Sequence, residues 1–306
     1  MVNNNFDNCT SFHIDNGAFM GRLVRLDKVV NTILDRHQYP RQVSAVVAES
    51  TALGALLSST IKYNGLFTLQ TQSSGPVTMV VVDVTSEGRI RACANVNQEM
   101  LDKALELRKS DTDELLAAPH YMGNGHLAFT VDQGPETDLY QGIVDLQGKN
   151  LSECALRYFK QSEQIETYLQ LFLQAPDKDG ESWKAAGILL QKLPDNGGKI
   201  SDDTEALNEA WNEAVIFAQS LKAEEVFDEK LSAEEILTRL FHANKLEITK
   251  TKEYHFGCCS RDKLFNTLHA MADKDIEDMC ENNKITATCH FCGEVYSFDK
   301  GELLSH

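Results

Sequence analysis

The chain has 306 residues, of which 42% are hydrophobic, and its 46 acidic and 29 basic residues give a formal net charge of −17. This length and apolar content predict one large domain or two to three smaller ones with a real core. The negative charge argues against nucleic acid as a partner, because phosphate binding requires clustered Lys and Arg. A zinc-ribbon adaptor or nucleic-acid binder is therefore kept only as an alternative from a different functional class.

The sequence carries neither a membrane signal nor an enzyme motif. Residues 1–7 lack the basic start and apolar run of a signal peptide, and no run of eighteen apolar residues occurs, so we expect a cytoplasmic protein with no membrane partner. Dinucleotide, Walker, zinc-protease and serine-hydrolase motifs are missing from the sequence. We therefore predict that the protein is not an enzyme.

The first 194 residues mix helix and strand patterns. Apolar spacing predicts helices over 26–37, 43–61 and 151–174, and alternation predicts strands over 65–72, 126–131 and 139–146. Residues 77–84 and 89–96 flank a Gly-containing turn and predict a β-hairpin, and 185–190 is a buried strand or short helix. Because strands occur in runs with helices before and after them, the fold class is α+β. We expect residues 1–194 to form a mixed helix and sheet core domain.

Residues 195–252 differ in composition, and we expect them to form an acidic helical linker. The stretch 195–250 holds thirteen acidic and six basic residues, and its apolar side chains lie at helical spacing. Ser232 and Glu235 form a capping box at the start of the second predicted helix. Either this is an ordinary surface helical domain, or it is a marginal segment whose apolar stripe stays covered only while a neighbour holds it.

Residues 253–306 predict a small C-terminal zinc-binding module. Short helices are expected over 261–271 and 275–279, and a hairpin over 285–288 and 295–298. Four cysteines of this module would supply the thiolates for one tetrahedral zinc: Cys258, Cys259, Cys289 and Cys292. Because the same sulfurs oxidise to disulfides, zinc binding could be coupled to a redox switch.

The remaining cysteines and histidines are weaker candidates. Cys280, His290 and His255 are reserve metal ligands. The scattered cysteines at positions 9, 93 and 154 are expected to be buried thiols that only fill space.

The first cysteine pair is irregular because Cys258 and Cys259 are adjacent. Neighbouring side chains of an extended segment point to opposite sides, so both sulfurs can bind one ion only if the backbone turns there. Gly257 is a source of that freedom. A disulfide between the two would be strained, since adjacent Cα atoms lie about 3.8 Å apart and disulfides usually need roughly 4.4 to 6.8 Å.

Motifs along the whole chain resemble those of the heat shock protein 33 family, the redox-regulated bacterial holdase chaperones. They occur in order as Gly21-Arg22-Leu23-Val24-Arg25-Leu26, Arg36-His37-Gln38-Tyr39-Pro40, Leu69-Gln70-Thr71-Gln72, Gly75-Pro76-Val77, Tyr140-Gln141-Gly142-Ile143-Val144, Tyr158-Phe159 with Ser162-Glu163-Gln164, and Cys259-Ser260-Arg261.

The resemblance implies an ATP-independent chaperone that is inactive while its four cysteine thiolates hold one zinc. Oxidants would form two disulfides and release the zinc, and the linker would then unfold and expose a surface for unfolded client proteins. A homodimer in the oxidised state and transfer of clients to downstream folding chaperones are implied in the same way. This resemblance favours the second interpretation of the acidic linker, a marginal segment that stays folded only while a neighbour holds it.

One departure from the family pattern affects the predicted site. The family has F-x-C-x-C-S-R, whereas this chain has Phe256-Gly257-Cys258-Cys259-Ser260-Arg261, with one residue fewer between the cysteines. A weaker zinc site, a disulfide that involves Cys280, or a chaperone with constitutive or impaired activity are the alternatives that this departure leaves open.

Overall fold

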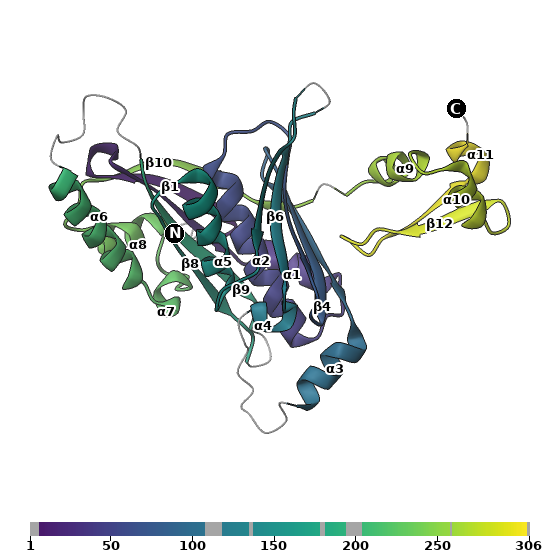
Figure 1. Ribbon diagram of the computed structural model, residues 1–306, viewed down its shortest axis with the longest axis horizontal. Helices are drawn as coiled ribbons and strands as arrows, with labels where there is room; N and C mark the ends of the chain where they lie inside the picture. Colours follow the sequence, from purple (N-terminus) through teal and green to yellow (C-terminus); the bar gives the residue numbers. More distant parts are fainter. Residues whose placement is uncertain are drawn as a thin grey trace.

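The computed structural model describes residues 6–107, 118–134, 137–177, 181–193, 204–257 and 259–304. Two mainly antiparallel β-sheets enclose a central helix, a group of helices covers the outer face of one sheet, and a small module extends from the other (Figure 1). This α+β arrangement confirms the predicted fold class.

The first sheet has the strand order β10-β1-β2-β9-β8. Its strands are β1 (Asn8–Ile14), β2 (Phe19–Leu26), β8 (Thr167–Gln174), β9 (Lys184–Lys192) and β10 (Leu246–Glu253), and a 3₁₀ turn (Asp15–Gly17) joins the first two. Strand β9 is buried on both faces: Ala185 and Leu189 face one hydrophobic cluster while Ile188 and Leu190 face another. Burial on both faces explains the continuous apolar run of this strand.

The second sheet has the order β11-β5-β4-β3-β6-β7. Its strands are β3 (Leu66–Ser73), β4 (Val77–Thr85), β5 (Arg89–Val96), β6 (Gly125–Asp132), β7 (Tyr140–Asp145) and the two-residue β11 (His255–Phe256). The β4–β5 hairpin forms as predicted, with Gly88 at φ +89° in its turn. Strand β11 pairs in parallel with the start of β5 and so brings the chain to this sheet just before the cysteine pair.

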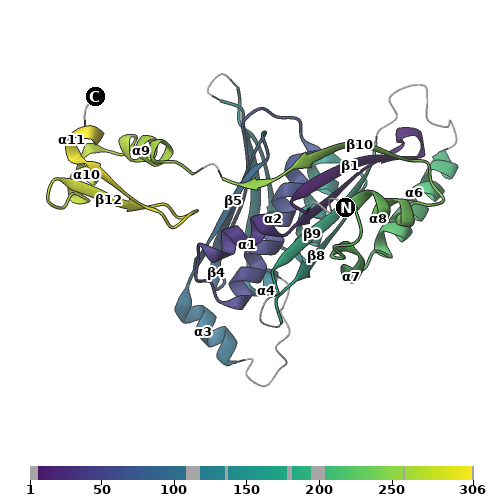
Figure 2. The same cartoon turned by 180° about the vertical axis from the view of Figure 1, so that it is seen from behind.

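Helix α2 (Arg41–Thr60) lies between the two sheets and contacts strands of both (Figure 2). It is long and apolar enough, by length and composition, to cross a membrane, but 83% of its most apolar window is buried inside the protein. Its role as the core helix accounts for this apolar character. The other helices around the core are α1 (Lys28–Asp35), α3 (Gln98–Glu106), α4 (Pro119–Met122) and α5 (Leu151–Tyr158), which continues as a π-helix (Phe159–Glu163).

Three linker helices cover the outer face of the first sheet: α6 (Thr204–Gln219), α7 (Ala223–Val226) and α8 (Ala233–Leu240). Their apolar side chains pack with Phe12, Phe19 and Leu23 of β1 and β2 in a second hydrophobic cluster. The capping box predicted at the start of α8 is present, because Ser232 Oγ accepts from Glu235 N–H and the Glu235 carboxylate accepts from Ser232 N–H. The predicted boundary at residue 194 lies outside the described residues.

Two secondary-structure predictions were wrong. The helix expected over 151–174 ends at the π-helix, where Gln164 takes the left-handed conformation (φ +54°), and the segment continues as strand β8. The end of the predicted helical linker is also not helical, because residues 246–253 form β10 and pair with β1 at the edge of the sheet. Strand β10 depends on a partner distant in sequence and β8 on pairing with the strand that follows it, and local apolar spacing reveals neither pairing.

The C-terminal module has a small core of its own. It contains β11, α9 (Arg261–His269), α10 (Asp273–Asp278), the hairpin of β12 (Lys284–Thr288) and β13 (Val295–Asp299), and α11 (Lys300–Leu303). Among the described residues of the module, five hydrophobic side chains form its buried cluster: Leu268, Ile276, Ile285, Phe298 and Leu303. A core of this size gives little stability without a disulfide or a metal.

Candidate metal centre

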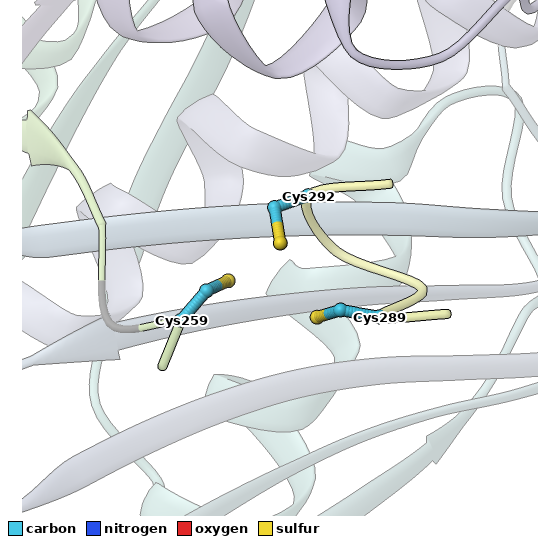
Figure 3. Close-up of side chains that lie close together, drawn as sticks. All are labelled: Cys259, Cys289 and Cys292. Carbon is cyan, nitrogen blue, oxygen red and sulfur yellow. The ribbon is translucent and has the colours of Figure 1, made fainter. Parts of the chain in front are cut away.

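Three of the four predicted cysteine ligands converge. Cys259 follows β11, while Cys289 and Cys292 lie in the turn of the β12–β13 hairpin, and their Sγ atoms are all within 4.8 Å of one another. Figure 3 shows the three sulfurs pointing toward a common centre. Sulfurs bound to one tetrahedral zinc lie about 3.8 Å apart, given Zn–S bonds of about 2.3 Å, so this spacing needs only small adjustments around an ion. The fourth predicted ligand, Cys258, lies outside the described residues.

The hairpin turn is folded tightly around its two sulfurs. Gly293 N–H donates to the Cys289 carbonyl (2.8 Å), and Cys289 N–H donates to the Glu294 carbonyl (2.9 Å). Gly293 adopts φ +69°, a conformation that favours glycine. A Cβ at this position would also lie 3.2 Å from the Arg36 carbonyl oxygen of the core. The turn is thus shaped both by the cysteines and by a close approach to α1.

The three thiols have different electrostatic surroundings. Burial raises the pKa of Cys259, and burial together with the nearby Cys289 and Cys259 sulfurs raises the pKa of Cys292 to about 12. Burial also acts to raise the pKa of Cys289, but hydrogen bonds from the backbone of Phe291 and Cys292 outweigh it and lower the pKa overall. A bound cation would relieve the repulsion among the three thiolates, so this set of donors suits a metal ion.

The reserve ligands do not join this group. Within the described residues, the only cluster of side chains suited to a metal ion consists of the three cysteines. Cys280 packs against the small core of the module, and His255 lies near Glu253 with 3.8 Å between Nε2 and Oε2. A metal would therefore be held by Cys259, Cys289 and Cys292, with Cys258 as the predicted fourth ligand.

Two arginines of the core reach the segments that carry Cys259 and the Cys289–Cys292 pair, which we call the first and second cysteine loops. These arginines were not among the site residues predicted from the sequence. Arg91 of β5 donates from Nη1 to Cys259 Sγ (3.8 Å), and its guanidinium lies 3.9 Å from the centroid of the Phe291 ring. Arg36, at the end of α1, donates to the Cys292 carbonyl (3.3 Å) and lies 3.7 Å from the Glu294 carboxylate. Arg36 belongs to a family motif noted above, whereas nothing in the sequence pattern singles out Arg91.

The scattered cysteines are buried, as predicted. Cys9 and Cys154 pack within the main core, and burial raises the pKa of Cys154 to about 11. Cys93 is two residues from Arg91 on β5, and its pKa is raised to about 12 by burial first and then by Asp83. A protonated, buried thiol is a poor nucleophile, which fits a packing role for these positions.

The linker helices are fastened to the first sheet by a buried arginine. Arg25 of β2 is 1% exposed and donates to the carbonyl oxygens of Val226 (2.8 Å), Asp228 (2.8 Å) and Leu231 (2.7 Å). These three carbonyls lie between the end of α7 and the cap of α8, so one side chain fixes the connection between the two helices. The Arg25 guanidinium also stacks 4.0 Å from the centroid of the Phe6 ring.

Comparisons with known proteins agree across almost the whole chain. A family model described as Hsp33 protein matches residues 7–299. A 33 kDa chaperonin from Caulobacter vibrioides is 32% identical over 96% of this chain and 95% of its own length, and one from Pseudomonas fluorescens is 35% identical over 95% and 90%. The fold is also similar to the crystal structure of a 33 kDa chaperonin from Thermotoga maritima, with a TM-score of 0.74, 21% identity, and coverage of 98% and 97% of the two chains.

Proposed function

The chain belongs to the Hsp33 family of chaperones, and from this premise we propose that it is a redox-regulated, ATP-independent holdase. In the reduced state Cys258, Cys259, Cys289 and Cys292 hold one zinc ion, and the protein is inactive. In the oxidised state the same residues form disulfides, and the protein binds unfolding clients. The convergence of three thiols in a module with a very small core is the observation that carries this proposal.

Zinc, when bound, keeps its ligands as thiolates and closes the two cysteine loops into one unit. The oxidative step removes these thiolates in pairs. Two thiolates give one disulfide and two electrons, and hydrogen peroxide takes up those electrons with two protons to form two water molecules. Two such events use all four sulfurs and leave no thiolate ligand for zinc. The module then loses the metal that joined its two cysteine segments.

The linker helices cover an apolar face of the first sheet, and release of these helices would expose it. Strand β1 presents Phe12, which packs against Phe241 with ring centroids 5.6 Å apart, and β2 presents Phe19, which packs against Trp211 at 5.4 Å. The chain runs from α8 through β10 and β11 directly into Cys259, so loss of order at the cysteines acts on the strand that leads back to the linker. An exposed apolar face of this kind fits unfolded proteins as partners.

Several further properties follow from this proposal and from the family. We expect a cytoplasmic protein with no membrane or nucleic-acid partner and no enzymatic activity. The oxidised form is expected to be a homodimer that passes its clients to downstream folding chaperones. The shortened spacing of the first cysteine pair supports one alternative, a chaperone of constitutive or impaired activity whose module holds zinc poorly.

The direct experiment compares reduced, zinc-loaded protein with peroxide-oxidised protein in a light-scattering assay of a thermally unfolding client. We expect oxidised protein to suppress aggregation at equimolar concentration and reduced protein to leave it unchanged. Equal suppression of aggregation in both states would contradict the redox switch and support a constitutively active chaperone. Failure in both states would indicate impaired activity.

A further inference from the structure

The side chain of Arg91 connects the core to both halves of the cysteine cluster. Its Nε and Nη2 donate to the Asp83 carboxylate (2.8 and 2.7 Å), which is buried and also accepts from Thr68 Oγ1 (2.6 Å). The remaining Nη1 is thereby aimed at Cys259 Sγ, and the guanidinium plane faces the ring of Phe291. One rigidly held cation thus touches the first cysteine loop through a sulfur and the second through an aromatic ring.

Arg36 makes a second, independent set of contacts with the same two loops. Its Nη1 donates to the Cys292 carbonyl and approaches Glu294, while its guanidinium lies 4.6 Å from the centroid of the Phe256 ring. The neighbouring His37 ring, stacked on Tyr39 with 4.6 Å between centroids, lies 3.3 Å from the Phe291 carbonyl through Nε2. The cysteine loops are therefore seated against α1 and β5.

We propose that Arg36 and Arg91 form a cationic cradle through which the core recognises the charge of the cysteine cluster. This inference rests on the proposed function, since it takes the reduced cluster to be four thiolates around one zinc. Such a cluster has a net charge of about −2, and the neutral disulfides of the oxidised form have none. The cradle therefore attracts the reduced module and loses most of that attraction on oxidation.

The cradle provides a second way in which oxidation of the cysteines can change the structure of the core. Loss of zinc loosens the module itself, whereas loss of charge undocks the module from α1 and β5. Undocking frees β11 and the residue that follows it, Gly257, whose N–H donates to the Ile90 carbonyl (3.0 Å). Strand β11 in turn follows the strand that leads back to the linker helices. The core thus senses the cluster directly and not only through the stability of the module.

The test uses full-length, reduced, zinc-loaded protein and measures hydrogen exchange at 255–257 and 289–294 by mass spectrometry. Arg36→Gln removes a partly exposed charge without leaving a buried partner. Arg91→Lys keeps a cation for Asp83 but shortens the reach toward Cys259. Arg157→Gln is the matched control, because Arg157 is exposed on α5 and donates to Gln147 (3.1 Å), away from the cysteine loops.

We expect exchange at these two segments to become about tenfold faster in Arg36→Gln and Arg91→Lys, as loss of a hydrogen bond from a charged group implies, and to stay unchanged in Arg157→Gln. Oxidised wild-type protein should exchange there as fast as the two variants. Unchanged exchange in both cradle variants, or docking that persists after oxidation of the wild type, would overturn the cradle.

The zinc content of the wild-type protein and its activation by oxidant decide the proposed function separately. Suppose that the wild type binds zinc and is activated normally by oxidant, and that both cradle variants exchange at the wild-type rate. That result would reject the cradle and keep the redox switch. If the wild type binds no zinc, the proposed redox switch is rejected. If the metal-free cysteine loops nevertheless stay docked on the core, the cradle is rejected as well.

Discussion

The Nη1 atom of Arg25 donates a 2.7 Å hydrogen bond to the carbonyl oxygen of Leu231, joining strand β2 to the start of the last linker helix across 206 positions of the sequence. Burial lowers the pKa of Arg25 to about 10, so the guanidinium still carries its charge at neutral pH. Backbone carbonyls are its main partners, and the Glu229 carboxylate nearby is paired with Lys184 (2.6 Å). Attachment of the linker to the core therefore depends strongly on this one side chain.

Replacing Arg25 by Met should release the linker helices without oxidation. The substitution keeps an apolar stem but leaves three carbonyls without their donor, of which those of Val226 and Leu231 are buried, and this costs about 3 kcal/mol or more. We expect faster proteolysis within 204–241 and partial suppression of client aggregation by the reduced protein. Arg239→Gln is the control, since Arg239 is exposed on α8 of the same linker. If Arg25→Met behaved like this control, the buried arginine would not hold the linker.

The cysteine ligands can be separated from the reserve cysteine by metal analysis. We expect about one zinc per chain in reduced wild type and in Cys280→Ser, whose thiol packs in the small core of the module. Cys289→Ser and Cys258→Ser should retain zinc weakly, with affinity reduced about tenfold or more by loss of one thiolate. Elemental analysis after dialysis against a mild chelator measures this. Zinc loss from Cys280→Ser with retention in Cys258→Ser would exchange the roles of the two residues.

Gly293 should be intolerant of a side chain. Alanine at φ +69° costs about 1 kcal/mol, and its Cβ would press on the Arg36 carbonyl oxygen at 3.2 Å. We expect Gly293→Ala to transfer zinc to a colorimetric chelator about fivefold faster than wild type, as that energy implies. Gly301→Ala in α11 is the control, because a Cβ there meets no atom within 4 Å. Equal rates in the two variants would show that the turn has no such constraint.

The core should lose stability as the pH rises toward neutral because of Glu49 on α2. Burial raises the pKa of Glu49 to about 7, above its ordinary value of 4.5, although backbone hydrogen bonds from Ala118 and Leu151 act in the opposite direction. The folded state therefore binds this proton more tightly than the unfolded chain, so its contribution is complete below about pH 4.5 and is lost as the pH rises through about 7.

Glu49→Gln should remove that dependence. At pH 8 the variant is expected to be about 1 to 3 kcal/mol more stable than wild type, and near pH 5 the two should be similar. Urea unfolding of reduced protein between pH 5 and 8 measures the difference, with the exposed Glu99→Gln as control. A constant offset between Glu49→Gln and wild type across this range would contradict the assigned ionisation.

Local patterns in the sequence predicted the elements that depend on local contacts. The core helix α2, the β4–β5 hairpin and the capping box at Ser232 all follow from spacing and turn residues that lie close together in the chain. Strand β10 was missed because it is an edge strand with mostly exposed polar side chains, and its pairing with β1 joins residues more than two hundred positions apart.

The same distinction applies to the site. The hairpin that carries Cys289 and Cys292 and the convergence of Cys259 with this pair could be predicted, because ligand chemistry restricts which residues meet. The arginines that hold the linker and seat the cysteine loops could not. Arg25 stands in one of the family motifs, but that motif does not give its role, and nothing in the sequence singles out Arg91. Only the folded sheets bring these two side chains to carbonyls and a sulfur contributed by distant segments.

Hydrogen exchange of the linker helices, residues 204–241, before and after peroxide treatment measures whether oxidation of the cysteines releases these helices. We expect slow exchange in the reduced, zinc-loaded protein. After oxidation, fast exchange should appear together with release of one zinc per chain and with suppression of client aggregation. Linker helices that remain protected after all four cysteines are oxidised and zinc has left would contradict the redox switch.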